Sequence, residues 1–550
     1  MSGCLRRTRE EHPLVLSLSK DVRANAAAAA VLAVVVGAYT WPLLSHARTA
    51  IPGGPTDRDV ATMVWNVGWV WHALTSGGSL LRTDDVLVPF GADLRLHTYG
   101  LLQGLLAAPM VPLVGVVGAF NVMLVATLLL NGLLIYSLIH KETCNPPAAL
   151  IAATCFMLAT PLLDHFRVGR PTFASLWLVV AALLVMRALL ARPRLWHGFA
   201  LGISFVACLL TDLQIALYAA LWLALYAAWR VRWRHAPPLA VGALLTSGVF
   251  ITIFGGAAAL AADDFPRPAL RDMQEYSFRV WDFLDPAVLQ HAYGLELGVA
   301  AVLAIVIWRR PSIWLIGALV FEVLALGPFL QPTDVPLPFA ALSVWPPLSQ
   351  FRTPYRLVMP AALGLSVVLG MVLSANARVS SRMSVAIALT LIAARAAAAV
   401  AFEPFPTQTY PSYAMYERIK HEPGSFTLLE VPFGVRSGLE RIGDGGEVLE
   451  FYQHIHGKPL LNGMIARLPG HVFAEYRAHP SLRVLSGEAV PAPLADLQDV
   501  LGWTGVRYIL VHKNMLTAEQ QQRIEALIIQ TATLDTTEAD LALYRVTPLV

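Results

Sequence analysis

Two aspartates stand two residues apart in the run GGPTDRD at residues 53–59. A carboxylate such as Asp59 can take the proton of a hydroxyl nucleophile as a general base. Asp57 and Asp59 together can also share a divalent cation, Mg²⁺ or Mn²⁺, that neutralises a leaving phosphate. The alternative is an ordinary polar loop with a Gly-Pro turn, because this spacing is common by chance. The pattern makes the two aspartates candidates for catalysis and for metal binding.

Arginines supply the second chemical feature. A guanidinium group binds a phosphate through two parallel hydrogen bonds, so arginines grouped on one side of a membrane suit an anionic ligand. The alternative is salt bridging among the loops, which accounts for many single arginines. We expect a substrate-binding region that contains His165, Arg167, Arg170, Asp212, Arg352 and Arg356.

Composition shows what must position these side chains. Of the 550 residues, 56% are hydrophobic and only 14% are charged, against about 25% charged in soluble domains. Most of the chain must therefore have lipid as its solvent. Apolar stretches long enough for a membrane of about 30 Å predict about eleven spanning helices. They lie near 25–44, 119–139, 147–163, 172–191, 195–211, 213–229, 238–260, 291–308, 311–330, 357–375 and 383–402.

Basic clusters orient these helices. They fall in every second loop, at Lys141, Arg187–Arg194, Arg230–Arg234, Arg309–Arg310 and Arg378–Arg382. The positive-inside rule then places those loops and the N-terminal tail, residues 1–24, in the cytoplasm. An odd number of spans leaves the C-terminal domain outside. We expect a multi-pass protein of a bacterial inner membrane.

Residues 98–117 are the exception to this alternation. They are apolar enough to cross, but counting them as a span would put Lys141 and every later basic cluster outside. Pro109 and Pro112 also weaken a straight helix. We therefore predict a juxtamembrane or re-entrant segment within one large first external loop, residues 46–118.

Hydropathy falls after the last apolar stretch, and residues 403–550 have the size and charge balance of a small domain. Short β-type runs at 425–432, 506–512 and 541–546 and an amphipathic helix at 517–530 predict an α/β domain. His454 and His456 stand two residues apart within 452–458. They form either a hydrogen-bonded structural turn or a ligand-binding pair on one face of a strand.

The ordered motifs resemble the GT-C superfamily of membrane glycosyltransferases, which take a sugar from a polyprenyl-phosphate carrier. The resemblance covers nearly the whole chain, and each motif is short. It comprises an N-terminal anchor, the loop opening at Asp57 and Asp59, and the motifs at 65–74, 88–91, 97–98, 120–121, 351–356, 452–459 and 462–463. It implies an acidic base in the first external loop, for which Asp59 is the best match. His97 would then join the substrate-binding residues.

The resulting expectation is an all-α polytopic membrane bundle, residues 25–402, followed by a small extracytoplasmic α/β domain. The implied reaction moves a sugar from a polyprenyl-phosphate donor to an extracytoplasmic glycan, lipid or protein. The lipid bilayer is a partner, nucleic acid is not, and the oligomeric state is not predicted. One rival is a transporter or flippase of a lipid-linked or anionic solute, which the intramembrane Glu322 would suit. The other is a non-catalytic envelope assembly protein.

Overall fold

The computed structural model describes residues 14–228, 230–255, 265–284, 312–344, 349, 351–375, 381–402 and 404–547. The chain forms two compact units. The first comprises Met1–Ala47, Asn121–Leu260 and Pro268–Thr407, and the second comprises Arg48–Phe120, Ala261–Arg267 and Gln408–Val550. The second unit therefore combines most of the predicted loop 46–118 with most of the predicted domain 403–550.

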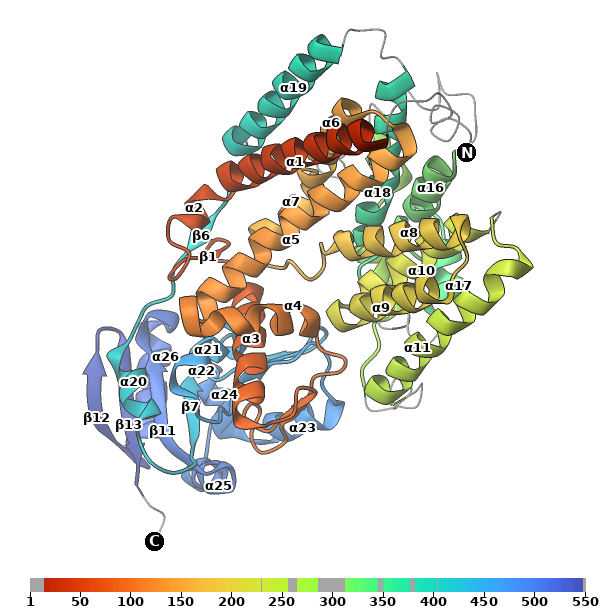
Figure 1. The fold of residues 1–550 in the computed structure, drawn as a ribbon. Coiled ribbons are helices and arrows are strands. Elements are labelled where there is room, and N and C mark those ends of the chain that lie inside the picture. Colours follow the sequence, from red (N-terminus) through yellow and green to blue (C-terminus); the bar gives the residue numbers. More distant parts are fainter. Residues whose placement is uncertain are drawn as a thin grey trace. The chain divides into compact units, whose positions relative to one another are not determined.

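The first unit is built from helices (Figure 1). They are α1 (Leu14–Tyr39), α2 (Trp41–Leu44), most of α5 (Val111–Thr143), α6 (Pro146–Met157), α7 (Thr160–Arg167), α8 (Leu176–Ala191), α9 (Leu195–Thr211), α10 (Leu213–Ala227), α11 (Ala236–Phe254), α13 (Leu270–Glu275), α16 (Ile313–Ala325), α17 (Pro338–Ser343), α18 (Val358–Ala375) and α19 (Ser381–Phe402). Short elements complete the unit: η3 (Trp233–His235), η4 (Val280–Leu284), η5 (Pro354–Leu357), β4 (Phe329–Leu330) and β5 (Val335–Pro336).

Small residues let these helices pack closely. A Cβ atom added at Gly198 of α9 would lie 1.8 Å from the backbone oxygen of Pro238 in α11. Gly202 and Gly242 approach each other in the same way, so the two helices touch through their backbones. Close approach through glycine is typical of helices that associate in lipid, where burying apolar side chains brings no advantage over lipid contact.

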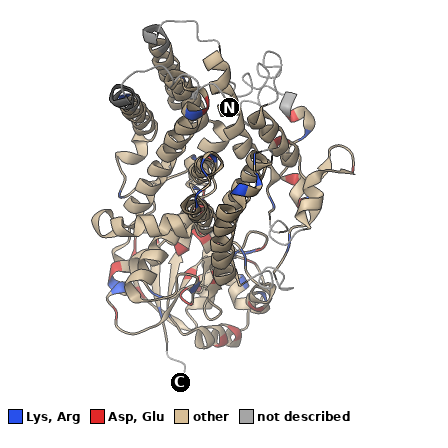
Figure 2. Cartoon of the chain, turned by 45° about the vertical axis from the view of Figure 1, so that its right-hand side comes forward, with Lys and Arg blue, Asp and Glu red and all other residues tan. Residues whose placement is uncertain are grey.

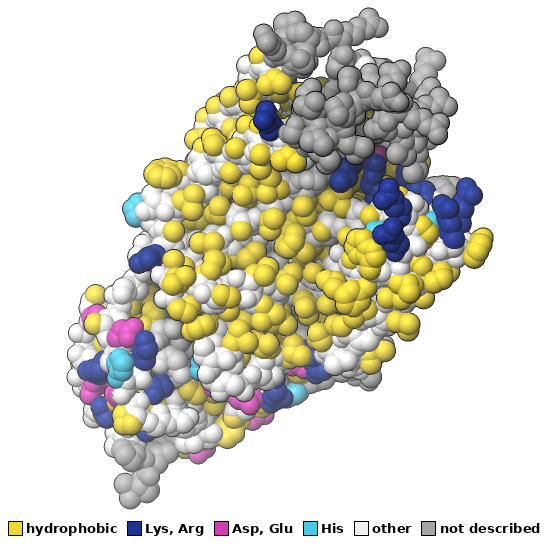
Figure 3. Space-filling view, viewed as in Figure 1, with side chains coloured by type: hydrophobic (Ala, Val, Ile, Leu, Met, Phe, Trp, Pro, Cys, Tyr) yellow, Lys and Arg dark blue, Asp and Glu magenta, His cyan; other side chains and the backbone are white. Residues whose placement is uncertain are grey.

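Much of the surface of the first unit in the view of Figure 3 is apolar. Large hydrophobic side chains of α9 and α11 are exposed, among them Phe199, Ile203, Leu244 and Ile251. Figure 3 shows hydrophobic side chains spread widely over one face of the molecule, and most of the length of the long helices bears no charged side chain (Figure 2). Such a surface is costly in water and suits a bilayer.

Four helical segments in the described residues are long and apolar enough to cross a membrane: Val22–Tyr39, Leu101–Thr143, Trp233–Phe254 and Pro354–Ala375. The pair α6 and α7, bent by 49°, makes a fifth if it is one broken span. Further apolar helices are shorter. The predicted stretch 291–308 lies outside the described residues, and the other predicted stretches coincide with helices. The count of about eleven spans stays a prediction.

The segment 98–117 forms α4 (Leu101–Ala107), the turn η2 (Ala108–Met110) and the beginning of α5. With the rest of α5 it forms the largely apolar helical stretch Leu101–Thr143, which is 43 residues long. At 1.5 Å per residue, that length is about twice the thickness of the hydrocarbon core. The helical conformation breaks at Gly115, whose φ is 77°. The break would let the segment lie beside the membrane while the remainder of α5 crosses it.

The second unit contains the larger sheets. Its elements are β1 (Ile51–Pro52), α3 (Asp59–Ser76), β2 (Arg82–Thr83), β3 (Ala92–Asp93), α4, η2, β6 (Thr407–Gln408), α20 (Ala414–Lys420), β7 (Thr427–Val431), β8 (Val435–Arg436), β9 (Arg441–Ile442), α21 (Gly446–Glu450), α22 (Gln453–His456), β10 (Gly463–Met464), α23 (Gly470–Ala478), α24 (Pro480–Leu485), α25 (Leu494–Thr504), β11 (Val506–His512), η6 (Lys513–Met515), α26 (Ala518–Ile528), β12 (Ala532–Glu538) and β13 (Leu541–Val546).

The main sheet has the order β12-β13-β11-β7. β7 and β11 run parallel, and β13 runs antiparallel to both β11 and β12. The predicted strands at 425–432, 506–512 and 541–546 and the predicted helix at 517–530 are confirmed as β7, β11, β13 and α26. The smaller sheet β10-β8-β9 lies in the same unit.

Candidate functional site

Asp59 opens α3, the central helix of the second unit. Residues Val60–Val70 of this helix are buried on every side. A carboxylate in the first turn of a helix is favoured by the positive end of the helix dipole. Asp59 is therefore held by a rigid element, with its side chain exposed to about 23%.

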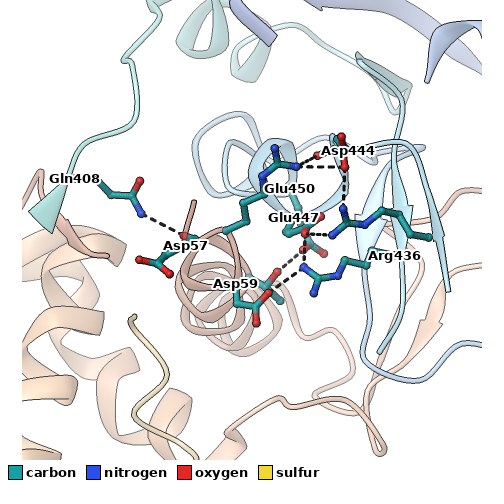
Figure 4. Close-up of polar contacts among 10 residues, drawn as sticks. Asp57, Asp59, Gln408, Arg436, Asp444, Glu447 and Glu450 are labelled. Carbon is teal, nitrogen blue, oxygen red and sulfur yellow. Dashed lines mark hydrogen bonds and ion pairs between the residues drawn. The ribbon is translucent and has the colours of Figure 1, made fainter. Parts of the chain in front are cut away.

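Arg436, at the end of β8, contacts this carboxylate. Its Nη1 lies 2.9 Å from Oδ1 of Asp59 and also pairs with the Glu447 carboxylate (Figure 4). A Cβ atom at Gly434 would lie 2.3 Å from the backbone nitrogen of Gly446, so only glycine lets β8 approach α21 this closely. The close approach places the guanidinium group between two carboxylates from distant segments.

The network continues with alternating charges. Arg441 lies 3.4 Å from Glu447 and 2.8 Å from Asp444. Arg58, next to Asp59 in sequence, lies 3.4 Å from Asp444. The outer members are exposed to solvent, which weakens these pairs, whereas Glu447 is only 1% exposed. The strongest link to Asp59 therefore runs through Arg436 to a buried carboxylate.

Glu450, one helical turn after Glu447, is fully buried. Burial raises its pKa well above the ordinary value, and the nearby Glu447 charge adds to this. Its Oε2 accepts a hydrogen bond of 3.4 Å from Thr62 of α3. The sequence analysis did not select Arg436, Glu447 or Glu450. The only sequence signal was the run GGEVLE at 445–450, where two glycines precede two glutamates three residues apart.

Asp57 has a different role from Asp59. Its Oδ2 accepts a hydrogen bond of 2.8 Å from the Gly54 amide, and Gln408 donates to its backbone oxygen at 3.2 Å. Figure 4 shows Asp57 on the side of Gln408 and Asp59 on the side of Arg436. Among the described residues no three His, Cys, Asp or Glu side chains are grouped to hold a metal ion. The two carboxylates have separate partners, an arrangement that does not favour a shared cation.

His97 joins two parts of the second unit. Its Nδ1 accepts a hydrogen bond of 3.0 Å from the Ala466 amide, so Nε2 carries the proton and donates to Asn66 Oδ1 at 3.1 Å. Asn66 in turn donates to the Thr98 carbonyl. Burial lowers the pKa of His97 to about 3, so the ring is neutral. Its contacts position the loop before α4 against α3.

A second cluster forms in the first unit. The Arg356 guanidinium lies over the Phe173 ring, 4.1 Å from its centre. His165 of α7 also lies beside that ring, with ring centres 5.6 Å apart. Arg170 and Arg356 both act electrostatically on His165. The structure therefore brings three of the predicted substrate-binding residues together from α7, the following loop and η5.

Arg356 is only partly satisfied in this cluster. Its Nε is buried and has no hydrogen-bond partner within the described part of the chain. Its backbone oxygen accepts from the Tyr218 hydroxyl at 3.3 Å, which ties η5 to α10. A buried guanidinium donor without a partner is unfavourable unless a ligand supplies the acceptor. The chemistry of two arginines beside a neutral aromatic ring suits a phosphate.

The other predicted residues have local partners. Asp212 accepts the Gln214 amide at 2.7 Å and caps α10. Arg167 lies 3.5 Å from Asp164. Arg352 lies over the Tyr276 ring at 4.8 Å. Thus Asp57, Asp59 and His97 belong to the second unit, and the remaining predicted site residues belong to the first.

No family model and no curated protein matches the sequence. Solved structures share its fold. The arabinofuranosyltransferase AftD from Mycobacteria aligns over 96% of this chain with 15% identity and a TM-score of 0.58. ArnT from Cupriavidus metallidurans, bound to undecaprenyl phosphate, aligns over 96% of this chain with 13% identity and a TM-score of 0.52. The alignment covers 40% of AftD and 98% of ArnT, so the chain spans less than half the length of AftD. The likeness confirms the expected GT-C-type fold.

Proposed function

We propose that the protein transfers a sugar from a polyprenyl-phosphate-linked donor to an acceptor on the extracytoplasmic side of a bacterial inner membrane. The observation that carries the proposal is the Arg356 cluster, in a chain that shares its fold with a protein solved in complex with undecaprenyl phosphate. Hydropathy and the alternation of basic loops support the location. The N-terminus would be cytoplasmic, and the C-terminal domain would lie outside.

The donor phosphate would bind at Arg356 and Arg170. Their guanidinium groups neutralise the negative charge that grows on the phosphate as its bond to the sugar breaks. Fixed donors in a partly buried site stabilise such charge more effectively than water does, because they are already oriented. No cation is needed for this step, since a polyprenyl-phosphate donor leaves as a monophosphate.

Asp59 would act as the general base. The acceptor hydroxyl oxygen attacks the anomeric carbon, and the bond from that carbon to the phosphate oxygen breaks. Polyprenyl phosphate leaves with the electron pair, and the hydroxyl proton passes to the Asp59 carboxylate. Arg436 contacts Oδ1 of that carboxylate. It would act as a positioning residue that fixes the orientation of the base.

The test is binding of a photo-crosslinkable undecaprenyl-phosphate analogue to the purified full-length protein in lipid nanodiscs. Unlabelled undecaprenyl phosphate should compete, and Arg356→Gln should reduce crosslinking at least about tenfold, equivalent to about 1.4 kcal/mol. Arg192→Gln is the matched control, because Arg192 is exposed and follows α8. Equal crosslinking of wild type and Arg356→Gln would show that Arg356 does not bind the phosphate. The assignment of a polyprenyl-phosphate donor would then lose its main support.

A further inference from the structure

A cleft of about 280 Å³ opens in the second unit between α3 and α22. Trp65, Trp69 and Trp71 of α3 line one side. His454 and His456 of α22 line the other side. From the sequence, these two histidines formed either a structural turn or a ligand-binding pair. A Cβ atom at Gly68 would lie 3.1 Å from the His454 Cβ, so glycine lets the two helices approach closely. The Arg356 cluster and the Asp59 network do not contribute to this lining.

The tryptophan side of the cleft is aromatic, with Trp65 and Trp69 buried behind the partly exposed Trp71. Trp65 and Trp69 are stacked, with ring centres 5.9 Å apart and an angle of 13° between the planes. Trp65 is fixed by a hydrogen bond of 2.6 Å to Gln453. Trp71 is half-buried at the same cleft. Rigid aromatic faces with a polar N–H at one edge suit a ligand that is apolar on one side and polar on another.

The histidine side offers both a hydrogen-bond donor and a hydrogen-bond acceptor. Nδ1 of His456 accepts the Lys458 amide at 3.0 Å, so Nε2 carries the proton. That buried Nε2 and the buried Nε1 of Trp69 have no hydrogen-bond partner among the residues described. Nδ1 of His454 donates to the Phe451 carbonyl, which leaves Nε2 as an acceptor. The cleft therefore presents donors and an acceptor, as a hydroxyl-bearing ligand requires.

The charge of the cleft does not favour an anionic ligand. Burial lowers the pKa of His454 to about 4 and that of His456 to about 3, so both are neutral at neutral pH. Lys420 pairs with Glu417 at 3.3 Å, and Asp85 faces His72 at 3.7 Å. Lys420 is the one lysine or arginine of the described residues that lines the cleft, and it is already paired, so a phosphate or carboxylate would gain little here. The residues also form no group of three metal ligands in the described chain.

We propose that this cleft binds a neutral sugar residue of a glycan chain, stacked on Trp71 and hydrogen-bonded to the two histidines. The volume of about 280 Å³ lies just below the usual range for small-molecule sites, about 300–1,000 Å³, which suits one or two sugar rings. If the proposed transfer reaction is correct, on which this part rests, the acceptor is a carbohydrate and the cleft holds its chain.

Isothermal titration calorimetry tests the proposal with full-length protein in nanodiscs and no donor lipid. The probes are hexasaccharides of glucose, mannose and arabinose, each titrated separately. At least one should bind, and Trp71→Ala should weaken that binding about tenfold through loss of a stacking face, equivalent to about 1.4 kcal/mol. Thr75→Trp adds bulk at the exposed edge of the cleft without altering the core, and should weaken binding further.

Trp503→Ala is the matched control, because Trp503 is 42% exposed on α25 in the same unit and lies outside the cleft. It should bind like wild type. No binding of any hexasaccharide, or binding that Trp71→Ala and Thr75→Trp leave unchanged, would overturn the proposal. Sugar binding without sugar transfer would instead contradict only the proposed function. Transfer to a protein or lipid acceptor without sugar binding would contradict only the cleft assignment.

Discussion

Asp59 and Arg436 form an ion pair of 2.9 Å although 377 residues separate them in the chain. The same guanidinium group pairs with Glu447, which is buried. Asp59 thus has its orientation set by the C-terminal part of the chain, and the first loop alone does not define the proposed base.

Asp59→Asn should abolish most transfer. The amide preserves the shape of the side chain but cannot accept the hydroxyl proton, and general-base catalysis typically contributes about 10²–10⁴-fold. Arg436 keeps Glu447 as a partner, so the amount of folded protein should stay near wild type. The measurement is glycosylated product per unit of protein in membranes. Full product from this variant would show that Asp59 is not the general base.

Arg436→Gln should affect both stability and rate, because it leaves the Glu447 carboxylate buried beside a single, more distant arginine. Removing one partner of a buried ion pair commonly costs about 3–5 kcal/mol. Adding Glu447→Gln removes the buried unpaired carboxylate and should reverse most of the decrease in melting temperature. Transfer should remain low in the double variant if Arg436 positions Asp59. Recovery of both quantities together would assign Arg436 a purely structural role.

Asp57→Asn should reduce transfer far less than Asp59→Asn. Its side-chain oxygen can still accept the Gly54 amide, so the turn before α3 is retained. A chelator should leave transfer unchanged, because the two carboxylates have separate partners. If chelator and Asp57→Asn instead cause similar losses, which Mg²⁺ or Mn²⁺ reverses for the chelator, a shared cation is present. Assays with and without each metal distinguish the two cases.

The stability of the second unit should depend on pH below 7. Burial lowers the pKa of His97 from 6.5 to about 3, so between these values the unfolded chain binds a proton that the folded chain does not. Stability is therefore lost as the pH falls through this window, by up to about 1.4 kcal/mol per pH unit for each such histidine. His97→Gln should make the dependence shallower, whereas the exposed His421→Gln should not. Thermal unfolding followed by near-ultraviolet circular dichroism at pH 7 and pH 5 measures both slopes.

The topology can be tested by fusion of a reporter that is active only outside the cytoplasm. Fused after Val546, at the end of β13, it should be active, because the alternation of basic loops requires an odd number of spans. Fused after Arg192, in a predicted cytoplasmic loop, it should be inactive. Activity of the second fusion but not the first would reverse the orientation of the whole chain.

The sequence was most informative where local pattern determines structure. β7, β11 and β13 are short apolar runs, and their strand pattern is visible without knowledge of their neighbours. β12 was missed because it is an edge strand whose residues are mostly polar and exposed. Its conformation depends on pairing with β13, which follows it in the chain.

The candidate site was only partly predictable for a related reason. Asp59 could be selected because it lies in a short motif in the first loop. Arg436 and Glu447 could not, because charged residues in turn-rich segments are ordinarily solvated, and only the packing of β8 and α21 buries them. Arg356, Arg170 and His165 were expected as a group, but their arrangement around the Phe173 ring depends on the tertiary fold.

The composition of the second unit also determines the order in which the protein can mature. Its first part ends at Phe120 and its main part begins at Gln408, so most of the first unit is synthesised between them. α3 ends at Ser76, and α21, which packs against it, begins at Gly446. At roughly 5–20 residues per second, α3 therefore waits about 20–75 s for this helix. During that interval its tryptophans have no partner from the C-terminal region. Asp59 cannot meet Arg436 until the intervening chain has left the ribosome, so a chain truncated before β8 would lack the ion pair that orients the proposed base.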